Sequence, residues 1–359
     1  MNGAKKVRVL VVDDSAVMRR LLTEILGADP EIEVVGAAAD PYEAREQIKQ
    51  LNPDVLTLDV EMPRMDGLTF LRNLMRLRPM PVVMCSSLTQ QGAEATLDAI
   101  ALGAVDFIEK PRVVNGITGL AHELIEKVKG AAAANVRQLA VPPETAVEQV
   151  PRVARAFSSR HSNTRLIAIG ASTGGTEAIR AVLESLPPDV PGIVIAQHIP
   201  KAFSGSFAVR MNACSPLEVC EATDGQPILP GHAYIAPGDK HLLVVKEGTQ
   251  LRCRLSDADL VNRHRPSVDV LFRSVAEQLG AHAIGVLLTG MGKDGAEGLK
   301  EMLEAGAQTL AQDEASSVVW GMPGAAWQIG AVQSLHPLNQ IADRILHIAS
   351  ARTYAAHRA

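Results

Sequence analysis

The fold of the chain is decided by the stretch Leu166-Ile167-Ala168-Ile169-Gly170-Ala171-Ser172-Thr173-Gly174-Gly175-Thr176. Its apolar run ends in small residues, and a helical pattern follows up to Leu186, so we predict a strand, a tight turn and a helix. Residues 170–174 fit the pattern G-x-S-x-G, which is typical of a serine nucleophile held on a sharp turn. The glycines keep the tight backbone path and the approach of a substrate open. Ser172 is therefore a candidate nucleophile.

Length and composition favour a globular protein with two domains. The chain has 359 residues, of which 47% are hydrophobic, and a net charge of −5. Neither half is strongly basic, which disfavours nucleic acid as a partner. No apolar stretch reaches the ~18 residues of a membrane span, which predicts no membrane insertion. The four cysteines form no C-x-x-C pair, so we expect free thiols and a cytoplasmic location.

Residues 1–125 form the first predicted domain, in which strand and helix patterns alternate without a break. This alternation predicts a flavodoxin-like α/β domain with a parallel sheet. Polar residues stand at the ends of the predicted strands, namely Asp13, Asp14, Asp59, Ser86 and Lys110. Carboxylates that converge on one sheet edge repel each other unless a cation lies among them, and oxygen ligands suit Mg²⁺. The plainer alternative, strand-end acids facing water, does not explain why four strand ends carry polar groups.

These residues resemble the receiver domain of two-component response regulators. The resemblance rests on the following matches: Asp13-Asp14, Asp59 with Met62-Pro63 and Asp66-Gly67, Ser86, and Lys110-Pro111. It implies that Asp59 is the phospho-acceptor and that Asp13, Asp14 and Asp59 hold Mg²⁺ for phosphorylation. It also implies that Ser86 and Lys110 contact the phosphoryl group and that Phe107 is the switch aromatic.

Residues 126–164 are predicted to be a linker. Helical periodicity fades there, and Pro142-Pro143 and Pro151 would break any long helix. A solvated tether explains this composition better than a dedicated partner site does. We expect a second domain over residues 165–350 and a C-terminal tail over residues 351–359.

The second domain is predicted to be a Rossmann-like, doubly wound parallel sheet with an antiparallel hairpin inserted. Two strand patterns, His232–Ile235 and Leu242–Val245, flank Pro237-Gly238-Asp239, which has the composition of a hairpin turn. The segment Leu251–Leu255 is expected to add a third antiparallel strand. A helix over Leu338–Ala349 closes the domain.

Three strand ends of this domain carry reactive side chains. Ser172 ends the first strand, His198 follows a buried strand, and Asp294 lies in a glycine-rich stretch before a helix. A hydroxyl, an imidazole and a carboxylate are the parts of a Ser-His-Asp triad. His198 would accept the serine proton, Asp294 would fix the imidazole tautomer, and the backbone N–H groups of Met291 and Thr173 would bind the oxyanion.

Each of these residues also has a plainer interpretation. The pair Gly174-Gly175 before a helix could cradle a phosphate, although the stretch lacks the G-x-G-x-x-G pattern. Taken alone, His198 would be a hydrogen-bonded structural residue and Asp294 a helix N-cap. His264 has two interpretations, a position in the site and a position in a solvated loop, and the solvated loop is favoured. The triad hypothesis depends on the three residues occurring together.

The second domain resembles the catalytic domain of the chemotaxis protein-glutamate methylesterases. The matching stretches are Gly170–Thr176, Gln197–Pro200, His264–Phe272 and Leu288–Gly295. The order Ser…His…Asp differs from the Ser…Asp…His of α/β-hydrolases. The resemblance implies hydrolysis of glutamate γ-methyl esters on chemoreceptors, with release of methanol, and deamidation of receptor glutamines. It also implies a chemotaxis histidine kinase as the phosphodonor, activation when Asp59 is phosphorylated, and no cofactor in the catalytic domain.

Three other classes of protein fit the sequence less well. A transcriptional response regulator would carry a basic helix-turn-helix module after the linker, and none is readable. A non-enzymatic scaffold is disfavoured because Ser172, His198 and Asp294 are all intact. A dinucleotide oxidoreductase is disfavoured because its glycine fingerprint is absent.

Overall fold

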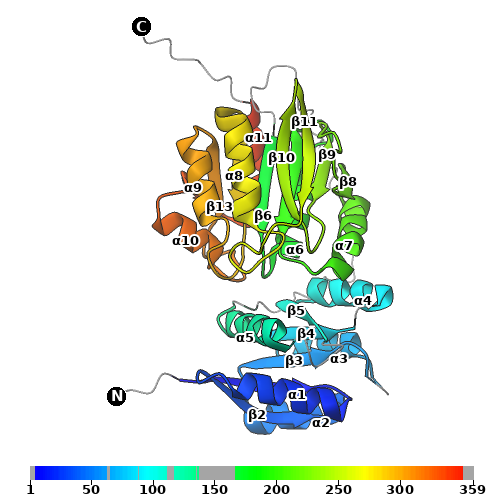
Figure 1. The fold of residues 1–359 in the computed structure, drawn as a ribbon. Helices are drawn as coiled ribbons and strands as arrows, with labels where there is room; N and C mark the ends of the chain where they lie inside the picture. The colour runs from blue at the N-terminus through cyan, green and yellow to red at the C-terminus, as the bar shows by residue number, and fades with distance from the viewer. Residues whose placement is uncertain are drawn as a thin grey trace, which may run out of the picture. The chain divides into compact units, whose positions relative to one another are not determined.

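The computed structural model describes residues 5–62, 65–87, 89–110, 117–134, 136 and 166–350. The chain divides into two compact units, Met1–Val147 and Glu148–Ala359 (Figure 1). The predicted tail and the predicted linker beyond residue 136 lie outside the described residues. Within the described residues, no helix combines the length and apolar character needed to cross a membrane.

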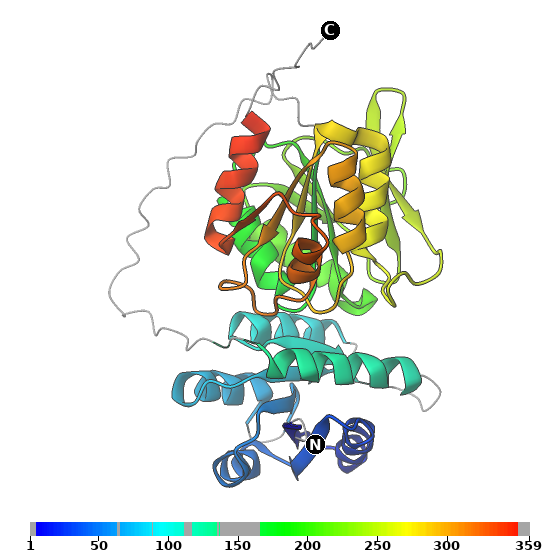
Figure 2. The same cartoon turned by 90° about the vertical axis from the view of Figure 1, so that its left-hand side faces the viewer.

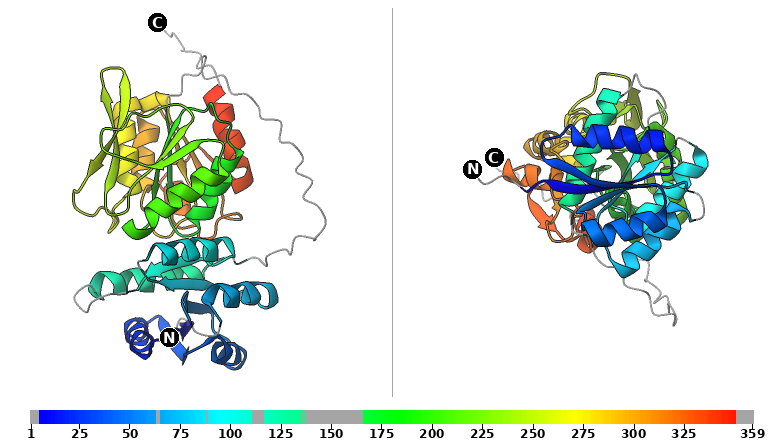
Figure 3. Two further views of the ribbon diagram at one scale, coloured as in Figure 1. Left: turned by 90° about the vertical axis from the view of Figure 1, so that its right-hand side faces the viewer. Right: turned by 90° about the horizontal axis from the view of Figure 1, so that it is seen from below.

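The first unit contains a five-stranded parallel sheet. Its strands are β1 (Val7–Val12), β2 (Ile32–Ala38), β3 (Val55–Asp59), β4 (Val82–Ser86) and β5 (Asp106–Glu109). The order β2-β1-β3-β4-β5 is that of flavodoxin-like folds. The helices are α1 (Ala16–Gly27), α2 (Pro41–Leu51), α3 (Gly67–Leu77), α4 (Gln90–Ala101) and α5 (Ile117–Ala132). Helix α1 packs beside α5, α3 packs beside α4, and the sheet lies between helices (Figure 3).

Helix α5 continues past residue 125, the predicted end of the domain. Its last turn is held to the same unit by Lys129, whose Nζ lies 2.8 Å from Asp29 Oδ2 and 2.6 Å from Glu31 Oε2. The predicted linker, residues 126–164, includes the low-complexity run Ala131–Ala134, but alanine is the best helix former. The alanines therefore extend the helix to Ala132.

The second unit contains a seven-stranded parallel sheet in the order β14-β13-β12-β6-β7-β9-β8. Its strands are β6 (Leu166–Ala171), β7 (Gly192–Gln197), β8 (Glu218–Glu221), β9 (His232–Ile235), β12 (Ala283–Leu287), β13 (Gln308–Gln312) and β14 (Ser334–His336). Its helices are α6 (Gly175–Ser185), α7 (Lys201–Cys214), α8 (Val268–Leu279), α9 (Ala296–Glu304), α10 (Met322–Gln328) and α11 (Leu338–Ser350), with a 3₁₀ turn at Gly280–His282. Helices α6 and α11 pack together on one face, and α8 and α9 on the other (Figure 2).

The predicted three-stranded antiparallel insertion is wrong in one respect. Strand β9 joins the main sheet, where it pairs in parallel with β7 and β8. The antiparallel sheet contains only β10 (His241–Glu247) and β11 (Gln250–Ser256), and the chain reverses between them at Gly248, whose φ is 62°. The turn residues 237–239 mark a change of direction, but they do not specify which strands pair on either side.

Two elements near the end of the chain also differ from expectation. The sequence pattern did not predict α10, which contains Pro323 and Gly324 and forms by burying Met322 and Ala326. In α10, burial of these two side chains overrides weak local propensity. The apolar pattern of Ala331–Leu335 predicts a strand over those residues, whereas the last strand of the structure is Ser334–His336.

The order of strands explains where a site can form. Strands β7, β8 and β9, which follow β6 in the chain, lie on one side of it, and the later strands β12, β13 and β14 lie on the other, so the strand order reverses beside β6. Ligands of open α/β sheets bind at such a switch point, outside the carboxyl ends of the strands. The carboxyl ends of β6, β7 and β12 therefore bring together Ser172, His198 and the loop that carries Asp294.

Candidate active site

Ser172 is fixed by backbone contacts to the neighbouring strand ends. Its N–H donates to the carbonyl of Thr289 at 3.0 Å. Its carbonyl accepts the N–H of Gly175 at 2.7 Å and the side-chain amide of Gln197 at 3.0 Å. A Cβ at Gly290 would lie 2.8 Å from Ser172 Cβ, so only glycine allows this approach. The serine is thus held rigidly at the junction of three strands.

His198 connects the serine to the acid. Its Nδ1 lies 3.0 Å from Ser172 Oγ, and its Nε2 lies 2.8 Å from Asp294 Oδ2. Because a carboxylate only accepts, Nε2 carries the proton and Nδ1 accepts the serine O–H. This is the tautomer that a general base at Ser172 needs. The two nitrogens are exchanged relative to the chymotrypsin triad, in which Nε2 faces the serine.

Asp294 is buried, with 2% of its surface exposed, and its carboxylate is surrounded by donors. The side-chain amide of Asn262 and the hydroxyl of Ser267 donate to Oδ1 at 2.7 and 2.8 Å, and the N–H of Val268 donates to Oδ2 at 2.7 Å. Burial alone would raise the pKa of Asp294, but the hydrogen bonds from His198, Asn262 and Val268 hold it well below its usual range.

The interpretation of Asp294 as the N-cap of the helix that follows it is wrong. The N-cap of α9 is Gly295, and no side chain caps that helix. The carboxylate turns instead toward the first residues of α8, where Val268 N–H donates to it. The positive end of that helix dipole stabilises the ionised acid.

A second cluster of charged residues lies at the carboxyl edge of the sheet in the first unit. Asp13, Asp14 and Asp59 each offer a carboxylate oxygen, and these oxygens lie within 4.8 Å of one another. The Nζ of Lys110 lies 2.8 Å from Asp13 Oδ2 and 2.7 Å from Asp59 Oδ2. Burial raises the pKa of Asp59 to about 6, an effect that Asp13 reinforces and Lys110 opposes.

Comparison with known proteins assigns both units. A family model described as CheB methylesterase matches residues 167–345, and one described as response regulator receiver domain matches residues 9–119. A protein of Xanthomonas oryzae pv. oryzae named "Protein-glutamate methylesterase/protein-glutamine glutaminase 2" is 59% identical over 350 residues, which are 96% of this chain and 98% of that protein. The chain belongs to the CheB methylesterase family. Both resemblances drawn from the sequence are thereby confirmed.

Other relatives agree with the assignment to CheB methylesterases. A protein of Hahella chejuensis named "Protein-glutamate methylesterase/protein-glutamine glutaminase 1" is 58% identical over 96% of this chain and 97% of that protein. The solved CheB methylesterase catalytic domain of Thermotoga maritima is 35% identical and covers 52% of this chain and 98% of that chain, with a TM-score of 0.51. The predicted class, two parallel-sheet α/β domains, is confirmed.

The structure also describes the residues that we expected around Asp59, the candidate phospho-acceptor of the receiver. Ser86 is buried, and its hydroxyl donates to the carbonyl of Gly92 in α4 at 3.1 Å. Phe107 is 3% exposed, and the Lys127 ammonium lies 5.1 Å from the centre of its ring. The hydroxyl of Ser86 thus contacts α4 in this structure, and its role toward a phosphoryl group stays a prediction.

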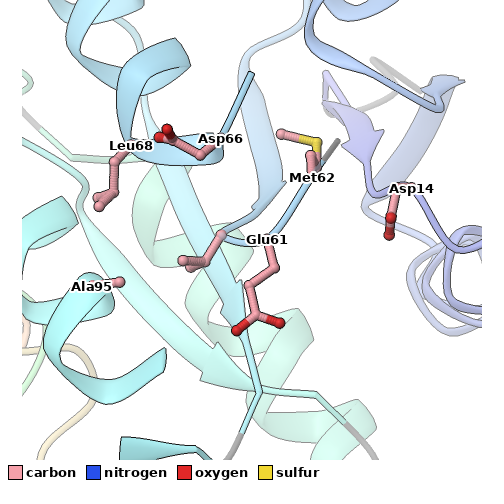
Figure 4. Close-up of a pocket in the computed structure, with 7 residues that line it drawn as sticks. Asp14, Glu61, Met62, Asp66, Leu68 and Ala95 are labelled. Atoms are coloured by element: carbon pink, nitrogen blue, oxygen red, sulfur yellow. The ribbon is translucent and has the colours of Figure 1, made fainter. Parts of the chain in front are cut away.

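A pocket of about 480 Å³ adjoins the acidic cluster of the receiver (Figure 4). Asp14 belongs to both, and the following residues also line the pocket: Glu61, Met62, Asp66, Leu68 and Ala95. The backbone N–H of Glu61 donates to Asp59 Oδ1 at 3.0 Å. Solvent-accessible space therefore lies beside the candidate phospho-acceptor.

The glycine-rich turn after Ser172 has a packing explanation. Gly174 has a φ of 74°, and a Cβ there would lie 2.6 Å from Val318 Cβ. Backbone conformation and packing thus account for this glycine without a bound phosphate.

Thr173, the residue before Gly174, is buried, and its carbonyl accepts the Thr289 hydroxyl at 3.0 Å. In the described part of the chain, the backbone N–H of Met291 makes no hydrogen bond to the protein. The oxyanion role of the Met291 and Thr173 N–H groups stays a prediction.

Three residues beside the triad were not assigned from the sequence. Gln197 ties the Ser172 and His198 carbonyls together at 3.0 and 3.2 Å. Asn262 contacts Asp294, and the His264 ring stacks on the His198 ring with 3.6 Å between centroids. A place for His264 in a solvated loop, which we favoured, is therefore wrong. These contacts join residues far apart in the chain, so no local sequence pattern predicts them.

Proposed function

We propose that this CheB-family chain is a phosphorylation-activated protein-glutamate methylesterase and protein-glutamine glutaminase, with Ser172 as its nucleophile. The single observation that supports this most is the hydrogen-bonded chain from Ser172 Oγ through His198 to Asp294. It lies at the carboxyl edge of the sheet in a domain whose relatives carry both activities in their names.

In the first half of the reaction, Ser172 Oγ attacks the γ-carbonyl carbon of a methylated glutamate. His198 Nδ1 takes the hydroxyl proton as the new C–O bond forms. The negative charge on the carbonyl oxygen is stabilised by the backbone N–H groups of Met291 and Thr173. When the tetrahedral intermediate collapses, the bond to the methoxy group breaks, and the proton on His198 passes to methanol.

In the second half, water attacks the acyl-serine. His198 Nδ1 removes a proton from the water and returns it to Ser172 Oγ as the acyl bond breaks. The product is a free glutamate side chain. A glutamine substrate follows the same steps, with ammonia as the leaving group and the same glutamate as the product.

Asp294 carries out its part without being protonated. Its low pKa keeps it ionised, so it stabilises the imidazolium that forms on His198 in each half of the reaction. Its hydrogen bond to Nε2 also keeps Nδ1 available as the acceptor for Ser172.

The receiver supplies the control, and its acidic residues fit Mg²⁺. The donor set consists of oxygens only, and the single ammonium of Lys110 offsets part of the charge of three carboxylates. Asp13, Asp14 and Asp59 would hold the ion, which would screen the charge of a phosphoryl group. Asp59 is the acceptor of that group, Lys110 pairs with its oxygens, and Ser86 and Phe107 respond to it.

The partners follow from this assignment. The substrates are methylated glutamates and glutamines of chemoreceptors, and the phosphodonor is a chemotaxis histidine kinase. The modified receptor helices and the kinase lie in the cytoplasm, where we also place this protein. Demethylation and deamidation each create a carboxylate on the receptor, which is a means of sensory adaptation.

The proposal is tested by measuring methanol and ammonia released from methylated receptor and from glutamine-containing receptor. We expect Ser172→Ala to abolish both reactions, because both need the same nucleophile. Glu297→Gln, an exposed acid at the start of α9, is the matched control and should keep both. Full activity of Ser172→Ala would refute the assignment of the nucleophile.

A further inference from the structure

A tight turn outside the triad contacts two of its members. The backbone of Val261 and His264 is joined by two hydrogen bonds of 3.2 and 2.9 Å. The two residues between them, Asn262 and Arg263, have φ values of 52° and 69°. Asparagine is one of the few side chains that adopt this left-handed conformation readily. The turn presents the side chain of Asn262 to Asp294 and that of His264 to His198.

The amide of Asn262 bridges two buried carboxylates. Its Nδ2 lies 2.7 Å from Asp294 Oδ1 and 2.7 Å from Asp269 Oδ2. An amide nitrogen has two hydrogens, so each carboxylate can receive one. Asp294 and Asp269 are only 2% and 3% exposed, and unscreened like charges in such a place repel strongly. Asn262 therefore lets the triad acid keep its position and charge beside a second acid.

The backbone N–H of Asp269 donates to Asp294 Oδ1 at 3.3 Å, and its carboxylate is anchored by a residue outside the triad. Its Oδ1 accepts the N–H of Gly298 at 2.7 Å, in α9, and its Oδ2 accepts Asn262. The amide of Asn262 is thus oriented by a carboxylate that is itself fixed between α8 and α9. The bond from Asn262 to Oδ1 of Asp294 leaves Oδ2 to accept His198 Nε2 at 2.8 Å.

His264 restrains the imidazole from a different direction. The two edges of the His198 ring are held by Ser172 Oγ and Asp294 Oδ2. The His264 ring covers one face of it, with 3.6 Å between ring centroids and 15° between ring planes. Hydrogen bonds at two edges still allow the ring to tilt about the line between them, and a stacked ring opposes that tilt.

We propose that the turn Val261–His264 is a positioning element of the triad, in which Asn262 orients Asp294 and His264 holds the plane of His198. This inference rests on the proposed hydrolysis of glutamate methyl esters and adds two residues to it. Neither residue exchanges a proton with the substrate. Their effect is on the geometry of the Ser172–His198–Asp294 chain, so it appears in kcat.

The test is methanol release from methylated receptor by Asn262→Gly and by His264→Ala. Glycine keeps the left-handed backbone of residue 262 and removes only the amide. Because a displacement of about 1 Å costs up to about 100-fold in rate, we expect kcat to fall about 10-fold to 100-fold in each variant, with KM unchanged. Asn262→Asp, which keeps the size of the side chain, should also lower kcat, because it places a third acid beside two buried ones.

Two controls separate positioning from folding. His264→Phe keeps a flat ring and should restore most of the kcat lost in His264→Ala. Glu297→Gln replaces an exposed acid outside the turn, at the start of α9, and should keep the parent kcat. If His264→Phe is as slow as His264→Ala, the stacked ring does not position His198. If Asn262→Gly or Asn262→Asp has the parent kcat, Asn262 does not position Asp294.

The same assay distinguishes failure of this inference from failure of the proposed function. If the parent protein releases no methanol, the proposed function is wrong. If the parent releases methanol and the variants do so at the same rate, the hydrolysis stands and the role of the turn is refuted.

Discussion

The Nε2 atom of His198 lies 2.8 Å from Oδ2 of Asp294, which leaves Nδ1 to face Ser172 Oγ at 3.0 Å. One carboxylate thus selects the imidazole tautomer that can accept the serine proton. The exchange of nitrogens relative to the chymotrypsin triad changes no role, because either nitrogen can act as the base once the other is protonated.

Replacing the acid with its amide should remove this selection. In Asp294→Asn, the side-chain amide can donate to Nε2. This stabilises the tautomer that carries its proton on Nδ1, which cannot accept the serine proton. We expect kcat for methanol release to fall by about 10⁴, as for the equivalent change in a serine protease. Glu297→Gln, an exposed acid near Asp294 in the sequence, should leave kcat unchanged. An Asp294→Asn protein with near-parent kcat would show that Asp294 does not set the tautomer.

The low pKa of Asp294 also predicts a pH dependence of stability. Its pKa in the folded protein lies below its ordinary value of 3.8, so the ionised acid stabilises the folded state. This contribution is present above the unfolded pKa and is lost as pH falls through the folded pKa. We therefore expect the stability difference between the parent and Asp294→Asn, measured by urea unfolding, to shrink as pH falls below about 4. A difference that stays constant or grows on acidification would contradict this cause of the pKa shift.

Gly290 should tolerate no side chain. A Cβ there would lie 2.3 Å from Met322 Sδ and 2.8 Å from Ser172 Cβ. We expect Gly290→Ala to lower the free energy of unfolding by about 1–3 kcal/mol and to reduce kcat by displacing the serine. Gly205→Ala is the control, because a Cβ there meets nothing within 4 Å and alanine favours helix α7 by up to about 1 kcal/mol. Equal kcat in the two variants would argue against the close approach at Ser172.

Mg²⁺ should stabilise the receiver through its acidic cluster. Asp13 and Asp59 are buried, and the only ammonium paired with them in the described residues is Lys110. At 100 times its dissociation constant, a ligand of the folded state adds about 2.7 kcal/mol to the free energy of unfolding. We expect Mg²⁺ to raise the thermal midpoint of the parent, EDTA to reverse the rise, and Asp14→Ala to reduce it. No shift of the parent midpoint at millimolar Mg²⁺ would refute the metal site.

The main features of the fold and both candidate sites could be predicted because parallel strands bring their carboxyl ends to one edge. Asp59 ends β3, Ser172 and His198 directly follow β6 and β7, and Asp294 lies in the loop after β12. Their places along the chain were therefore sufficient to group them. The pairing of the strands was harder to predict from the sequence. The turn near Gly238 suggested a hairpin, whereas β9 is paired in parallel with β7 across a long sequence separation.

The contacts that refine the site were beyond local patterns. Asn262 and His264 reach residues far away in the chain, and their roles depend on a tight turn and on which nitrogen of His198 faces the acid. The helical N-cap expected at Asp294 had the correct residue type at the correct spacing. It is overridden because the start of α8 supplies better donors from another part of the chain.

The central claim is that a reaction at Ser172 is controlled from Asp59. The most direct measurement is the rate of methanol release from methylated receptor, before and after a small phosphodonor and Mg²⁺ are added, for the parent, Asp59→Ala and Ser172→Ala. We expect the phosphodonor to increase the rate of the parent and to leave Asp59→Ala at its basal rate. We expect no methanol release by Ser172→Ala under either condition. Stimulation that survives in Asp59→Ala, or methanol release that survives in Ser172→Ala, would contradict the claim.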